Sequence, residues 1–106
     1  MAFTLRQLQY FIAVAEQGTV SGAAHDLSIS QSSVTEAVKE LELDLGVALF
    51  DRHARGLAIT HQGQQFLRHA TRILADVGDA RRTFAEEREI KEGALQLGVT
   101  SLVAGY

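Results

Sequence analysis

The sequence between residues 60 and 91 restricts the fold of this chain more than any other part. Its apolar positions are alternately four and three residues apart, which is the spacing of a heptad seam; they are Phe66, Ala70, Ile73, Val77, Ala80 and Phe84. A helix of about 30 residues would extend about 45 Å, farther than a small domain can cover. We therefore expect residues 64–91 to form a linker helix that pairs with a second copy of the chain through these six residues. The beginning of this helix, at Phe66 and Leu67, is also expected to cover its own domain.

Two shorter helices are predicted at the start of the chain. The first, at about 5–16, is indicated by a stripe of apolar residues that Gly18 can end, formed by Leu5, Leu8, Phe11, Ile12 and Ala15. Thr19 can cap the second, which ends near Leu27 and carries small residues suited to close packing against a neighbouring helix.

A third helix is predicted between the polar residues 28–30 and Gly46. Two helices joined by a turn of about three residues indicate a helix-turn-helix at about 19–38. Residues 49–60 then change to a period of two around an Arg55-Gly56 turn, which predicts a two-stranded hairpin, or wing. The predicted fold is mainly α: a winged helix-turn-helix in residues 1–63, with three helices and a two-stranded wing, followed by the long dimerisation helix.

The last residues abandon helical spacing. Leu95, Leu97 and Val99 are two residues apart, so residues 92–106 are expected to hold one strand that lacks a partner strand in this sequence. We interpret this segment as the opening strand of a second domain that the chain does not otherwise include.

Composition and charge exclude several kinds of site. Cysteine is absent, and the four histidines are not spaced as metal ligands, so no metal or cofactor is expected. The sequence contains no paired nucleophile and base and no phosphate-binding glycine loop, so an enzyme is not expected. There is also no apolar run long enough for a membrane span and no secretory signal, from which we expect a cytoplasmic protein.

The charge distribution argues against nucleic-acid binding by bulk electrostatics. Residues 1–66 contain four basic residues and seven acidic ones, and the net charge of the chain is −3. Any binding to DNA must therefore depend on a few placed cations.

The third predicted helix differs in polarity and charge between its beginning and its end. Its first residues, Gln31, Ser32, Ser33 and Thr35, are uncharged and rich in hydrogen-bonding groups, and its exposed side also carries Glu36 and Lys39. A recognition helix presents its N-terminal residues to the bases, and Glu36 can accept a hydrogen bond from a cytosine amino group. The alternative is that Ser30 only caps the helix and that Glu36 and Lys39 belong to a solvated face.

The wing offers two arginines. Arg55, at the predicted hairpin tip, can enter the narrow minor groove of DNA, where the negative potential is strongest. Arg52 either contacts DNA or braces the wing. The alternative for both is a solvated or intramolecularly paired arginine.

Residues 5–63 resemble the LysR-type transcriptional regulators of bacteria. The resemblance is carried by "AVAEQGTVSGAAHDLSISQSSV", by "LELDLGVALF" and by the wing pattern "R..RG..IT..G", in that order and spacing. Relatives often have a proline where this chain has Ser32 and a basic residue where it has Glu36.

The resemblance implies sequence-specific binding to double-stranded promoter DNA, with the recognition helix in the major groove and the wing in the minor groove. It also implies a homodimer through the linker helix, a tetramer in a full-length form, and a small-molecule effector bound by a C-terminal domain that is missing here. A second hypothesis is a winged-helix module that binds proteins and does not read DNA; its support is the acidic balance and the outward position of Leu43.

Overall fold

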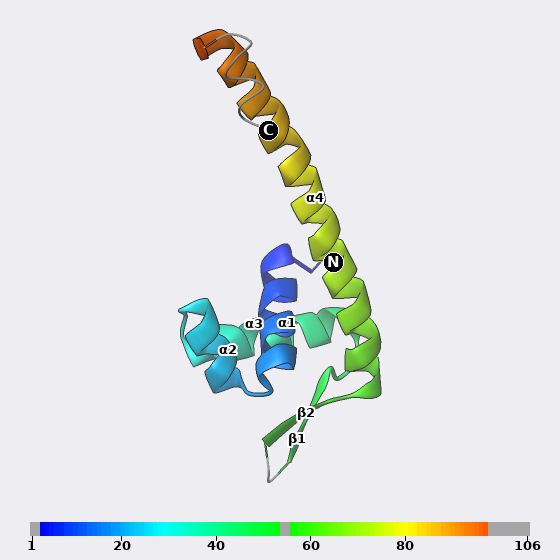
Figure 1. Ribbon diagram of the computed structural model, residues 1–106. Coiled ribbons are helices and arrows are strands. Elements are labelled where there is room, and N and C mark those ends of the chain that lie inside the picture. Colours follow the sequence, from blue (N-terminus) through cyan, green and yellow to red (C-terminus); the bar gives the residue numbers. More distant parts are fainter. Residues whose placement is uncertain (1–2, 54–55, 98–106) are drawn as a thin grey trace. The chain divides into compact units, whose positions relative to one another are not determined.

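The computed structural model describes residues 3–53 and 56–97, with side chains up to residue 88. Its elements are α1 (Leu5–Gln17), α2 (Val20–Leu27), α3 (Gln31–Leu45), β1 (Phe50–His53), β2 (Gly56–Ile59) and α4 (His61–Leu97) (Figure 1). The chain divides into two compact units, Met1–Leu74 and Ala75–Tyr106. The predicted fold, three helices and a two-stranded wing followed by a long helix, is confirmed.

Polar caps fix where the helices begin. The hydroxyl of Thr19 accepts from the amide of Gly22 at 2.9 Å, and the hydroxyl of Ser30 accepts from the amide of Ser33 at 3.1 Å. These bonds satisfy amide groups that have no partner inside the helix. Gly18 and Gly46 end α1 and α3 with φ of 76° and 73°, a left-handed conformation that suits glycine. The predicted limits of the three short helices are thus confirmed to within a residue.

Two apolar clusters hold the first unit together. The first cluster joins α1, α2 and α3, and its buried residues are Ala13, Val14, Ala23, Ala24, Val34 and Val38. The second joins α1 and α3 to the start of α4, and its buried residues are Leu8, Phe11, Leu41, Leu49 and Ala70. Phe50 packs against both clusters. Its ring lies 5.4 Å from that of Phe11, in the range of favourable aromatic pairs.

The wing is an antiparallel hairpin whose base is hydrogen-bonded to α3. Phe50 pairs with Ile59, and His53 pairs with Gly56. Glu42 of α3 accepts hydrogen bonds from the amides of Leu49 at 2.7 Å and Phe50 at 3.3 Å. Glu42 is therefore not a solvated side chain, because its carboxylate caps the backbone that leads into β1.

Thr60 connects the other end of the wing to α4. Its hydroxyl donates to the carbonyl of Ala48 at 2.6 Å and accepts from the amide of Gly63 at 2.9 Å. The amide of Thr60 also donates to the carbonyl of Leu49 at 2.9 Å. Thr60 therefore caps the start of the long helix.

Two predictions for the long helix are wrong. Ala70 was assigned to the dimer seam, but its exposed fraction is 0% because the core of its own chain covers it. An apolar stripe at this helical spacing can face either a second copy or the core of its own chain, so spacing alone could not separate the two. In addition, α4 continues to Leu97, so residues 92–97 are helical where a strand was expected; the remaining residues of that strand, 98–106, lie outside the described residues.

Candidate nucleic-acid interface

The polar first half of α3 lies on the outside of the three-helix unit. Val34, Val38 and Leu41 face inward and are buried. The predicted reading residues are exposed except Thr35, which is half-buried; the exposed ones are Gln31, Ser32, Ser33, Glu36 and Lys39. The fold therefore brings these six residues together on one side of a single helix, which we call the α3 face.

Hydroxyl groups gather at the beginning of the α3 face. The oxygen of Ser30 lies 2.8 Å from that of Ser33 and 3.2 Å from that of Ser32. Each hydroxyl can donate and accept, so the three can exchange partners with a base or phosphate at little cost. They also surround the positive end of the α3 dipole, where negative groups are favoured.

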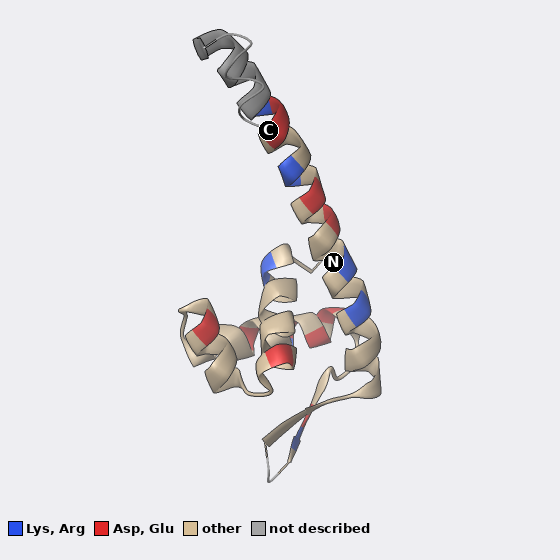
Figure 2. Ribbon diagram, in the orientation of Figure 1, with Lys and Arg blue, Asp and Glu red and all other residues tan. Residues whose placement is uncertain are grey.

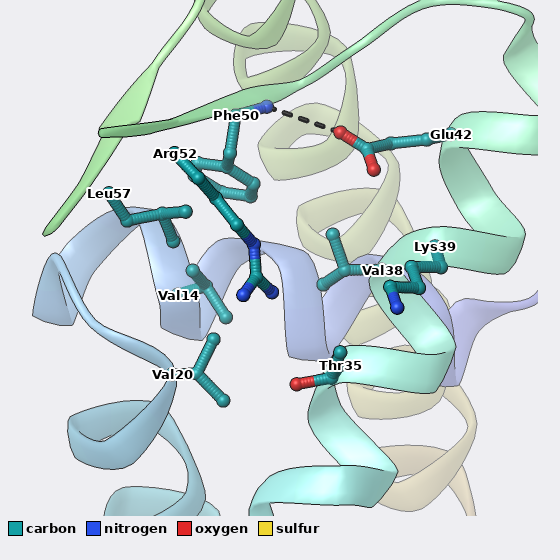
Figure 3. Close-up of a pocket in the computed structure, with 9 residues that line it drawn as sticks. All are labelled: Val14, Val20, Thr35, Val38, Lys39, Glu42, Phe50, Arg52 and Leu57. Carbon is teal, nitrogen blue, oxygen red and sulfur yellow. Dashed lines mark hydrogen bonds between the residues drawn. The ribbon is translucent and has the colours of Figure 1, made fainter. Parts of the chain in front are cut away.

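A hollow separates the α3 face from the wing. It is lined by apolar residues of α1, α2 and the wing and by Thr35, Lys39 and Glu42 of α3. Figure 3 shows the guanidinium of Arg52 reaching from β1 into this hollow, between Val14 and Val20 on one side and Val38 and Thr35 on the other. Arg52 thus places its charge beside the α3 face instead of at the hairpin tip.

A second hollow lies on the opposite side of the α3 face. Arg6 and Tyr10 of α1 line it together with Ser33, Glu36 and Ala37. Arg6 and Tyr10 were not among the residues predicted to contact DNA. No local motif marks them, since only the packing of α1 across α3 brings them to the same surface.

The first unit has few basic side chains, and several of them are not paired with acidic residues. In Figure 2, basic segments are visible at the start of α1 and on β1, whereas α2 and α3 carry acidic ones. Among the residues that the structure describes, Arg6, Lys39 and Arg52 form no ion pair, and all three are exposed. Their charges are therefore not neutralised by the protein itself.

Arg55 lies outside the described residues, so its predicted contact with DNA stays a prediction. The strand residues on either side of the 54–55 connection, His53 and Gly56, are paired with each other. Gly56 has φ of 122°, a conformation that side chains rarely adopt. The two strands of the expected hairpin are thus paired up to this glycine.

No group of side chains suited to a metal ion occurs among the described residues. Within the same part of the chain, no helix is long and apolar enough to cross a membrane.

Comparison with known proteins decides the family. A family model described as "Bacterial regulatory helix-turn-helix protein, lysR family" matches residues 5–64, more than half of the chain. The chain belongs to the LysR family. The resemblance found in the sequence is thereby confirmed.

Curated and solved LysR proteins are similar over most of this chain. The regulator CzcR of Bacillus cereus is 41% identical over 100 residues, which are 94% of this chain and 34% of CzcR. The crystal structure of the CbnR DNA-binding domain with DNA is 46% identical with a TM-score of 0.69, covering 77% of this chain and 98% of that one. The BenM DNA-binding domain with benA site 1 DNA is 32% identical with a TM-score of 0.73, covering 77% and 95%. This LysR chain spans about a third of the length of CzcR.

The second unit of this LysR chain carries the rest of the predicted dimer seam. Val77 is half-buried and Ala80 is exposed, and the exposed fraction of Phe84 is 69%. Phe66 and Ile73, which lie in the first unit, are half-buried against the second apolar cluster. Phe84 is thus the one large apolar side chain of this unit that is exposed, among the residues whose side chains the structure describes.

Proposed function

We propose that this LysR chain is the DNA-binding part of a bacterial transcriptional regulator and binds double-stranded promoter DNA in a sequence-specific way. The observation that carries the proposal is the α3 face, an exposed polar surface that includes the unpaired cation Lys39 and is flanked by the unpaired cations Arg6 and Arg52. The CbnR and BenM DNA-binding domains, which have the same fold over 77% of this chain, were solved in complex with DNA, which supports the same activity here.

The residues divide into reading and positioning roles. The first half of α3 enters the major groove, where side chains of Gln31, Ser32, Ser33, Thr35 and Glu36 meet base edges. Lys39, Arg52 and Arg6 contact phosphates and set the orientation of the helix on the duplex. Arg55 enters the minor groove from the wing.

We further propose that the regulator acts in the cytoplasm as a dimer joined through the second part of α4. The residues we assign to this seam are Ile73, Val77, Ala80 and Phe84, with Phe66 at its edge. We assign a tetramer and a small-molecule effector to a full-length form, in the part that a relative such as CzcR has beyond its match to this chain. Catalysis has no part in this function.

A protein-binding module is the second candidate. Leu43 supports it, because its exposed fraction is 83% and it lies on the later half of α3, one turn beyond Lys39 on the same side of the helix. An exposed leucine can anchor a partner protein. This reading predicts a partner whose capture depends on Leu43 and not on Arg52 or Lys39.

Selection of binding sites from random duplex DNA with this chain tests the proposed function. We expect a motif with two related half-sites, and affinity for it that falls as salt is raised, by about 0.9 log units per phosphate contact for each log unit of salt. Failure to retard any recovered or random duplex at low salt, with the chain folded and dimeric, would contradict DNA binding and favour the protein-binding module.

A further inference from the structure

The acidic residues of α3 differ in their hydrogen-bond partners and in their position along the helix. Glu40 accepts a hydrogen bond from the side-chain amide of Gln7 at 3.2 Å, and Glu42 is bound to two backbone amides of the wing. Asp44 lies in the last turn, about 12 Å along the helix from Glu36. Glu36 alone among them lies in the reading half of the helix.

Glu36 is also free of contacts that would hold or neutralise it. It is exposed, and within the described part of the chain it forms no hydrogen bond or ion pair. Arg6 and Tyr10 line the same hollow, but neither is bonded to it. Ser33 and Lys39 lie one turn before and after Glu36 on the same side of the helix.

In a complex with DNA, an unpaired carboxylate at this position costs free energy unless the DNA supplies a hydrogen-bond donor. It is repelled by the phosphates and by the acceptor atoms N7 and O6 of guanine, because an ionised carboxylate can only accept hydrogen bonds. In the major groove, cytosine presents an amino donor without an adjacent acceptor on the same base, whereas adenine presents N7 beside its amino group. Cytosine is therefore the base that an acid at position 36 selects.

We propose that Glu36 is a specificity-determining residue that reads a cytosine, and so fixes a C·G pair at one position of each half-site. The inference rests on the proposed function and deepens it, because it names the base that one side chain recognises. Glu36 contributes to discrimination and not to overall affinity, since it adds negative charge to the complex.

The test compares Glu36→Gln and Glu36→Ala with the unaltered chain on the half-site recovered by selection, with all four base pairs placed in turn at each position. We expect the unaltered chain to prefer C·G at one position by about fivefold or more, the size of a single good base contact. Glu36→Ala should abolish this preference, and Glu36→Gln should shift it to A·T, because a glutamine amide pairs with N6 and N7 of adenine.

Glu40→Gln is the matched control, since Glu40 is one turn further on and an amide oxygen can still accept from Gln7. We expect the base preferences of the Glu40→Gln variant to equal those of the unaltered chain. Unchanged preferences in both Glu36 variants would overturn this inference alone. Absence of binding by the unaltered chain would overturn the proposed function, and this inference with it.

Discussion

Gly63 lies directly against the carbonyl of Leu49. A Cβ atom at position 63 would be 2.2 Å from that oxygen and 2.6 Å from Cγ1 of Ile59, and real contacts of this kind do not occur at such distances. Gly63 is buried in the first turn of α4, and its amide donates to the hydroxyl of Thr60. The absence of a side chain is therefore what allows α4 to begin against the base of the wing.

Replacement of Gly63 by alanine should destabilise the first unit. Backbone atoms cannot withdraw as a flexible side chain can, so we expect a loss of about 2 kcal/mol or more in the free energy of unfolding. For a domain of this size, that corresponds to a decrease of roughly 10 °C in the midpoint of thermal unfolding. Circular dichroism during heating would measure it.

Gly78→Ala is the control for this prediction. Gly78 lies in the interior of α4, and a Cβ atom there would meet only the flexible end of Arg82, at 3.4 Å. Alanine favours a helix over glycine by about 0.5–1 kcal/mol, so this variant should be as stable as the unaltered chain or slightly more stable. Equal midpoints for the two variants would show that Gly63 has no steric role.

Loss of the Glu42 carboxylate should loosen the wing. Glu42→Ala leaves the amides of Leu49 and Phe50 without their acceptor in a half-buried position, at a cost of about 1–3 kcal/mol. Glu42→Gln keeps an oxygen acceptor and should lose less. Urea denaturation would give these differences. Glu40→Ala, which removes only one exposed hydrogen bond, should change stability by no more than about 0.5 kcal/mol.

Arg52 should contribute to affinity for every DNA sequence. If its guanidinium contacts one phosphate, Arg52→Ala lowers the slope of log affinity against log salt by about 0.9. Fluorescence anisotropy over a series of salt concentrations, with preferred and random duplexes, measures this slope. The exposed Arg72 of α4 lies outside both hollows beside α3, and Arg72→Ala should leave the slope unchanged. An equal effect from both variants would mean that Arg52 has no specific phosphate contact.

Phe84 should be needed for the dimer. Glu at this position places a charge in the apolar seam, so Phe84→Glu should produce monomers at concentrations where the unaltered chain is dimeric. Sedimentation velocity distinguishes the two states. Thr83→Glu adds the same charge one residue away from the seam and should leave the dimer intact. A dimeric Phe84→Glu variant would place the dimer contact elsewhere.

The short helices could be predicted because their ends are encoded locally. Thr19, Ser30 and the glycines at positions 18 and 46 act within one turn of where they occur in the sequence. The wing was predictable for the same reason, since the glycine of its turn and its alternating residues are adjacent along the chain.

Contacts between distant or backbone groups were not predictable. Glu42 binds main-chain amides seven and eight residues away, which no side-chain pattern reveals. Arg6 reaches the neighbourhood of Ser33 only because α1 packs across α3. Ala70 shows a second limit. Its helix was predicted correctly, but the spacing did not indicate that the core of the same chain would cover this residue.

Phe50, the first residue of β1, packs against both apolar clusters of the first unit. Neither cluster can lose its packing without exposing a face of this ring, so the two should melt in one transition. In hydrogen exchange, the slowest amides of α1 and those at the start of α4 should then report the same free energy of opening. The fold therefore holds α3 and the start of α4 in fixed positions until both unfold together.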